Sequence, residues 1–220
     1  MYISHKHKIV FIRIPKTACS SITEFLIKNI ADPEAIHSGV DDSKIQSTLV
    51  SKAPIRELVM ANKYVHYTLQ DIVDDGFIKA EDLSTYKIYA VIRNPVDRQK
   101  SMYWFRKKWQ KEPPGSLQDY KNITIGNCEM KLSPTTGEEQ VSFMKYNNKS
   151  YGTFWLFENI DKELNNLMSS LGLNIKHDLP NHKSGNRKKD EFEFDKEVLN
   201  SLRAHYNNDF AMYKDLRIKQ

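Results

Sequence analysis

Apolar residues gather in short continuous runs along the chain, and stretches with helical spacing separate these runs. The runs at 8–14, 86–92 and 153–157 are rich in β-branched and aromatic residues, which predicts three buried strands. Pro15 ends the first of them. The shorter run at 64–67 is interpreted as a further short strand.

A helix is predicted after each of the three long strands. Apolar residues recur every three or four positions between 22 and 30, and Ser20 or Ser21 can cap the start of that helix. Asn94, which precedes a proline, is the expected N-cap of the second helix, and this helix should run to about Gln110.

The third long strand leads into a helix at 160–171, which Gly172 ends. Further helices are expected at 72–83 and 195–216, and the latter is amphipathic. A polar, basic loop at 174–192 separates the last two helical regions.

Strands that alternate with helices predict an α/β fold with a mainly parallel central sheet flanked by helices, a P-loop-like arrangement of three layers. The length of 220 residues fits a single domain over 1–220. The polar stretch at 111–150 is interpreted as an insertion that shapes an acceptor site. Ligands of such folds bind at the carboxyl ends of the strands.

Composition changes this picture little. The chain has 33 lysine and arginine residues against 28 aspartate and glutamate residues, and the net charge of +5 mildly favours anionic ligands. Two cysteines, Cys19 and Cys128, do not make a disulfide framework. The chain shows no signal peptide and no apolar stretch of about 18 residues, so we expect a cytoplasmic protein without a membrane segment.

The stretch Pro15–Ser21, with the sequence PKTACSS, joins the first strand to its helix. Small residues let the backbone curl so that several N–H groups point at one anion, and the helix adds its positive N-terminus. Lys16 supplies a charge, and Thr17, Ser20 and Ser21 supply hydroxyl donors. The stretch therefore predicts an anion-binding loop, against the alternative of an ordinary turn with a capping serine.

This loop differs from the Walker A motif, G-x-x-x-x-G-K-[ST], in which lysine follows the loop. Here Lys16 precedes the small residues, and the loop contains no glycine.

A second motif begins with Arg93, at the carboxyl end of the second strand, and includes Ser101 about two helical turns (~10–12 Å) further on. The planar guanidinium binds phosphate through two parallel hydrogen bonds, so this pair can clasp a phosphate group. A P-loop kinase usually places a magnesium-binding aspartate at such a strand end, so arginine indicates charge neutralised by side chains without a metal. A surface arginine beside a capped helix is the alternative.

Together the two motifs resemble those of the sulfotransferase superfamily, closest to the heparan 2-O and 6-O and the chondroitin-type carbohydrate enzymes. The family's 3′-phosphate motif, R-[ND]-P-x-x-R-x-x-S-x-[YF], is matched by Arg93, Asn94, Pro95, Arg98, Ser101 and Tyr103. In the family's 5′-phosphosulfate loop, glycine is commoner at the position of Cys19. Weaker matches are Phe157-Glu158-Asn159, the loop at 179–184, and Tyr206–Asp209 with Tyr213.

The resemblance implies transfer of a sulfuryl group from 3′-phosphoadenosine 5′-phosphosulfate to a hydroxyl, with adenosine 3′,5′-bisphosphate as the other product. It implies that Lys16 stabilises the leaving group at the bridging oxygen. The implied donor-binding residues are Lys16, Thr17, Ala18, Cys19, Ser20, Ser21, Arg93, Ser101, Lys183 and Ser184. The acceptor is expected to be a glycan, with a tyrosine, a lipid or a small metabolite as the alternatives, and no nucleic acid and no metal is expected.

A hydroxyl acceptor needs a general base that is active near neutral pH, and histidine suits this task. His66 lies between the two motifs, in the region where related carbohydrate sulfotransferases place a catalytic histidine, so it is the preferred base. A core histidine is the alternative interpretation, and His37 or Glu57 is the substitute base. His5 is expected on a frayed N-terminal segment.

Two other functions remain open at this level. An atypical P-loop phosphotransferase would depend on ATP and magnesium. A module that binds nucleic acid or another polyanion is suggested by the basic run at 183–189 and the aromatic, basic helix at 103–109, and its binding would depend steeply on salt.

Overall fold

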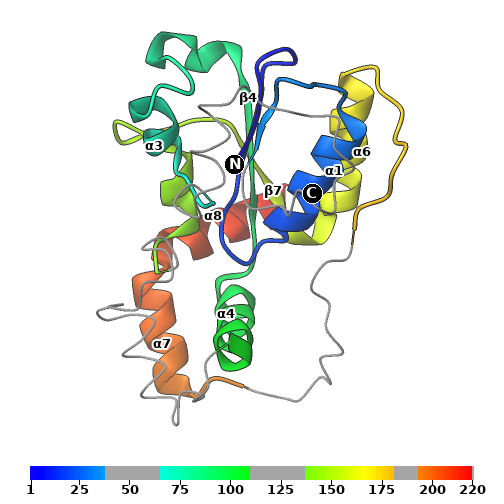
Figure 1. The fold of residues 1–220 in the computed structure, drawn as a ribbon. Helices are drawn as coiled ribbons and strands as arrows, with labels where there is room; N and C mark the ends of the chain where they lie inside the picture. The colour runs from blue at the N-terminus through cyan, green and yellow to red at the C-terminus, as the bar shows by residue number, and fades with distance from the viewer. Residues whose placement is uncertain (38–64, 110–136, 181–192, 220) are drawn as a thin grey trace.

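A computed structural model describes residues 1–37, 65–109, 137–180 and 193–219 (Figure 1). One sheet has the strand order β3-β1-β2-β4-β7. Its strands are β1 Tyr2–Ser4, β2 Ile9–Ile12, β3 Ile36–His37, β4 Lys87–Ile92 and β7 Thr153–Leu156. The central strands β2, β4 and β7 are parallel, whereas β1 runs antiparallel to both of its neighbours. This confirms the predicted α/β fold with a mainly parallel sheet.

The helices are α1 Cys19–Asn29, α3 Leu69–Asp74, α4 Pro95–Trp109, α6 Ile160–Ser170, α7 Lys196–His205 and α8 Asn207–Ile218. Short 3₁₀ helices are η3 Ala80–Thr85, η5 Gln140–Met144 and η6 Phe157–Asn159, and a small hairpin joins β5 Lys145–Tyr146 to β6 Lys149–Ser150. Asn94 caps α4 as predicted, because its side-chain oxygen accepts hydrogen bonds from the N–H groups of Val96 and Asp97.

The side chains of β2 alternate between two apolar layers, as the pleat of a strand requires. Ile9 and Phe11 pack in a cluster with α1 and α6, whereas Val10 and Ile12 pack with α3, η3 and η5. Figure 1 shows α1 and α6 on one side of the sheet and α3 on the other. The three predicted layers are therefore present, and the core lies on both faces of the sheet.

Two smaller clusters lie beyond the carboxyl ends of the strands. Ile92 and Leu156, the last residues of β4 and β7, pack with Val141 of η5 and Tyr213 of α8. A second cluster joins α7 to the first turn of α4. The C-terminal helices thus close the edge of the sheet at which ligands of this fold class bind.

The N-terminal segment is a strand of the sheet, so the expectation of a frayed terminus is wrong. The side chains of β1 are buried, and Ile3 pairs with Val10 in antiparallel register. His5, which follows β1, bonds through its Nδ1 to the hydroxyl of Tyr86 at 2.6 Å. Three residues are too few for a periodic pattern to be visible, so only their long-range pairing defines this strand.

The short strand expected at 64–67 is also wrong, because Val65 and His66 form a turn. The single helix expected at 72–83 is divided into α3 and η3, and Gly76 lies between them with a φ of 76°. The helix expected at 195–216 is two helices that meet at Tyr206. The ring of Tyr206 is buried, and its hydroxyl donates to the carbonyl of Gly137 at 3.2 Å.

Of the stretch 111–150, the structure describes residues 137–150. Phe143 and Met144 are fully buried in the core cluster beside α3, and the hairpin of β5 and β6 follows them. Residues 111–136 lie outside the described residues. Among the helices that are described, none combines the length and apolar character that crossing a membrane requires.

Candidate active site

The segment between β2 and α1 forms a tight loop with an unusual backbone. Lys16 and Ala18 both have left-handed conformations, with φ angles of 68° and 61°. Each such residue other than glycine costs about 1–2 kcal/mol, so the loop is held in place by its surroundings. Where left-handed residues alternate with right-handed ones, successive backbone N–H groups can turn toward one side and bind an anion there.

Helix α1 begins at Cys19, with Ala18 as its N-cap, so the expectation that Ser20 or Ser21 caps the helix is wrong. Ala18 has no side-chain oxygen, and no side-chain hydrogen bond caps this helix end. The two serines instead lie in the first turn. An anion in the loop can bind the N–H groups that a capping side chain would otherwise satisfy.

Two hydroxyl groups tie the loop to the end of β2. Thr17 is buried, and its hydroxyl donates to the carbonyl of Ile14 at 2.8 Å. Ser20 accepts a hydrogen bond at 3.1 Å from the guanidinium of Arg13. Because the Thr17 hydroxyl is turned inward, its backbone N–H is the group of this residue that can face an anion.

Arg13 adds a buried positive charge at the base of the loop. Its side chain is 1% exposed, and burial lowers the pKa of its guanidinium. A cation in such a place is stabilised by a nearby anion far more than an exposed cation would be. The interpretation from sequence missed this residue, although a charged residue within a buried apolar run is a recognisable signal.

Arg93 follows the last residue of β4 and reaches the loop. Its guanidinium donates to the carbonyl of Lys16 at 3.3 Å and lies 4.4 Å from the centre of the Phe157 ring. Phe157 begins η6, directly after β7, so the carboxyl ends of three parallel strands meet here. The aromatic ring holds the guanidinium by a cation–π interaction.

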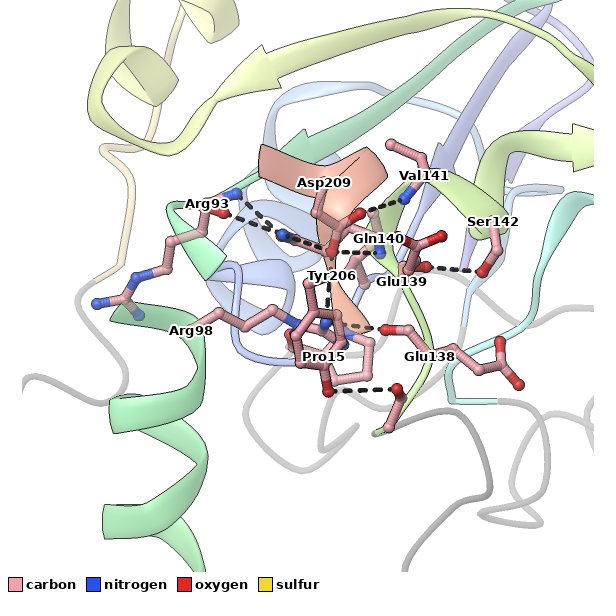
Figure 2. A network of polar contacts seen from close by, with 12 residues as sticks. Pro15, Arg93, Arg98, Glu138, Glu139, Gln140, Val141, Ser142, Tyr206 and Asp209 are labelled. Atoms are coloured by element: carbon pink, nitrogen blue, oxygen red, sulfur yellow. Dashed lines mark hydrogen bonds and ion pairs between the residues drawn. The ribbon is translucent and has the colours of Figure 1, made fainter. Parts of the chain in front are cut away.

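Arg98, on the first turn of α4, is 1% exposed and bonds to backbone carbonyls (Figure 2). It donates to the carbonyl of Pro15 at 3.2 Å and to that of Glu138 at 2.9 Å. The second motif thus contacts the first through both of its arginines. Ser101 is buried on the next turn of α4.

His66 lies at the end of β2, beside the same loop. The carbonyl of Arg13 has no hydrogen to offer, so the 2.7 Å contact means that Nδ1–H of His66 donates to it. In the neutral ring, Nε2 then carries the lone pair that can accept a proton. Burial, together with the charges of Arg13 and Arg98, lowers the pKa of His66 to about 3.

Cys19 belongs to this group, because its buried free thiol interacts with the guanidinium of Arg13. Other predicted residues stand apart from it. His37 lies in β3, which is separated from β2 by β1. Glu57, Cys128, Lys183 and Ser184 lie outside the described residues.

These features define a class of protein: an α/β fold with a tight strand-to-helix loop at one strand end and arginines from the neighbouring strand and helix beside it. The sulfotransferase family model matches residues 1–214, and the chain belongs to this family. A sulfotransferase from Alicyclobacillus acidocaldarius has a similar crystal structure, with a TM-score of 0.55 over 97% of this chain and 96% of that chain, at 14% identity. No curated protein sequence matches significantly.

Proposed function

We propose that this sulfotransferase uses 3′-phosphoadenosine 5′-phosphosulfate as its donor and transfers the sulfuryl group to a hydroxyl of a carbohydrate. The observation that carries the proposal is the contact of Arg93 with the backbone of Lys16, which brings two anion-binding groups to one edge of the sheet. A donor with two separate anionic ends suits such a pair of groups.

The loop holds the 5′-phosphosulfate in this proposal. The backbone N–H groups from Thr17 to Ser21, including those of Ala18, Cys19 and Ser20, face the phosphate, and the Ser20 hydroxyl donates to it. Ser20 can do so because its oxygen accepts from Arg13, which leaves its hydrogen for another partner. Arg93 and Ser101 bind the 3′-phosphate, and Lys183 and Ser184 cover the nucleotide.

The reaction is an in-line displacement at sulfur. The acceptor hydroxyl gives its proton to Nε2 of His66, and its oxygen forms the new bond to sulfur. The bond between sulfur and the bridging phosphate oxygen breaks, and that oxygen keeps the electron pair. Lys16 stabilises the charge that develops there, as preorganised cations do in phosphoryl transfer.

The low pKa of His66 keeps its ring neutral in the free protein, so Nε2 is unprotonated before the donor binds. The bound donor carries negative charges, and these raise the pKa of a neighbouring histidine. Donor binding therefore strengthens the base at the point in the cycle where it is needed.

Support for a carbohydrate acceptor comes from the sequence, which resembles the carbohydrate sulfotransferases most. The stretch 111–150 is proposed to shape the acceptor site, because it is rich in polar residues and follows the helix that carries Ser101. The whole chain acts as one catalytic domain in this proposal.

A transfer assay tests the proposal. The protein is incubated with sulfur-labelled donor and a panel of oligosaccharides, phenols and small alcohols, without added metal. We expect label in an oligosaccharide and release of adenosine 3′,5′-bisphosphate. Label in a phenol alone would overturn the carbohydrate assignment, and ATP-dependent phosphorylation without sulfate transfer would overturn the donor.

A further inference from the structure

Two buried residues outside both sequence motifs lie against Arg93 (Figure 2). Gln140 is the first residue of η5, and Asp209 is on the first turn of α8. Both side chains are 0% exposed. Burying a polar side chain lowers the stability of the fold unless the side chain is fully hydrogen-bonded. The partners of such a side chain therefore indicate which groups it positions.

The side-chain amide of Gln140 bonds to the backbone of Arg93 twice. Its Oε1 accepts from the N–H of Arg93 at 2.9 Å, and its Nε2 donates to the carbonyl of Arg93 at 2.9 Å. The regular pairing of β4 with β7 ends one residue earlier, at Ile92 and Leu156. Gln140 thus takes the place of a neighbouring strand at Arg93 and fixes the direction in which its side chain leaves the backbone.

Asp209 fixes the amide of Gln140 in turn. Its Oδ2 accepts from the backbone N–H of Gln140 at 2.8 Å and from Nε2 at 3.2 Å, and its Oδ1 accepts from the N–H of Val141 at 2.9 Å. Nε2 therefore has two acceptors, whereas Oε1 has the N–H donor of Arg93. With Asp209 in this place, only one of the two possible orientations of the Gln140 amide lets every donor face an acceptor.

The same carboxylate also reaches the anion-binding loop. Oδ2 of Asp209 lies 4.0 Å from Nη1 of Arg98. A different nitrogen of the same guanidinium, Nε, donates to the carbonyl of Pro15. Asp209 is thus linked to Arg93 through Gln140 and to the residue before Lys16 through Arg98. One buried group of α8 holds the two anion-binding motifs in a set relation to each other.

We propose that Gln140, oriented by Asp209, is a positioning residue that holds Arg93 in the place where it binds the 3′-phosphate of the donor. The proposal rests on the proposed function, because it assigns Arg93 to that phosphate. In this proposal, selectivity for a 3′-phosphorylated nucleotide depends on η5 and α8, which lie outside both sequence motifs.

The test compares Gln140→Ala with the wild-type protein in calorimetric titrations of adenosine 3′,5′-bisphosphate and of adenosine 5′-monophosphate. These two nucleotides differ by the 3′-phosphate. We expect affinity for the bisphosphate to fall about tenfold, which is about 1.4 kcal/mol, while that for the monophosphate changes less than about twofold. A structural role alone would weaken both equally.

Asn208→Ala is the matched control, because Asn208 joins the same helix to the start of η5 by donating to Glu139 at 2.8 Å. It should leave both affinities unchanged. Gln140→Glu is the second variant, for use if Gln140→Ala does not fold. Its carboxylate keeps the shape of the side chain but cannot donate to Arg93, so the same selective loss is expected.

An equal loss for both nucleotides, or no loss for either, would overturn the positioning role. A wild-type protein that does not prefer the bisphosphate would instead contradict the proposed donor site itself. The two failures are therefore distinguishable within one set of titrations.

Discussion

Lys16 occupies a left-handed backbone position whose carbonyl is bound by Arg93, so its side chain leaves a constrained loop. If it stabilises the leaving oxygen, Lys16→Met should lower kcat by about 10²–10³-fold, since loss of one such group costs about 3–4 kcal/mol. Steady-state assays with labelled donor measure this. Lys28→Met, on the exposed end of α1, is the control and should keep wild-type turnover.

His66 should affect turnover without affecting donor binding. His66→Gln removes the proton acceptor, and general-base catalysis contributes about 10²–10⁴-fold, so kcat should fall within that range. The affinity for adenosine 3′,5′-bisphosphate should stay near the wild-type value. His205→Gln, at an exposed position of α7, should change neither quantity. Wild-type turnover in His66→Gln would remove His66 from the mechanism.

His66 should also make folding stability depend on pH. Its pKa is about 3 in the folded protein, below the ordinary value of 6.5, so the unfolded chain binds a proton that the folded chain does not. The free energy of unfolding contributed by this group is complete above pH 6.5 and falls as the pH drops toward 3. Urea unfolding at pH 7 and pH 4.5 should show a smaller loss in His66→Gln than in wild type. Equal losses would argue against a buried, neutral ring.

At the scale of elements, the turn before β7 depends on Gly152. Its φ is 77°, and a Cβ built there would lie 2.3 Å from the carbonyl oxygen of Ile88 in β4. Gly152→Ala should therefore lower the free energy of unfolding by about 2–5 kcal/mol, through backbone strain and overpacking against a central strand.

Gly172 is the matched control for this prediction. It has a similar φ of 65°, but nothing lies within 4 Å of a Cβ built on it. Gly172→Ala should lower the free energy of unfolding only by the strain of a left-handed alanine, about 1–2 kcal/mol. If denaturant unfolding gives the same cost for both variants, the close approach of β4 to the turn is not the cause.

The elements that sequence could predict are those with strong local chemistry. The runs of β-branched and aromatic residues predicted the positions of β2, β4 and β7. Asn94 before Pro95 predicted the start of α4. The break at Tyr206 had no such signal, because no glycine or proline stands there. Helix α7 ends where the buried Tyr206 donates its hydroxyl to the carbonyl of Gly137. This contact exists only in the folded chain.

Across the whole molecule, some residues of the candidate site had a local sequence signal and others had none. The loop and Arg93 could be predicted because each directly follows a strand, and strand ends of a parallel sheet meet at one edge. Gln140 could not be predicted, since it stands in a polar stretch and its burial depends on α8, far along the chain. The residues proposed to bind the donor carry local sequence patterns, whereas the residue proposed to position Arg93 is defined by tertiary contacts.

The whole molecule should also become more stable when it binds the donor product. Adenosine 3′,5′-bisphosphate binds across segments from β2, β4 and α4 in the proposed site, so saturation at 100 times Kd should add about 2.7 kcal/mol to the free energy of unfolding. Thermal melting in a concentration series measures this. A melting temperature that does not change with nucleotide concentration would contradict the site.

In the proposed site, the two motifs bind opposite ends of one 3′-phosphorylated nucleotide. Titration of wild type and Arg93→Ala with adenosine 3′,5′-bisphosphate measures this arrangement. We expect saturable binding of one nucleotide per chain without metal. Arg93→Ala should lose about 10–100-fold in affinity, as expected for a charge-assisted phosphate contact worth about 1.5–3 kcal/mol. Equal affinity of both proteins for this nucleotide, or binding only of ATP with magnesium, would contradict it.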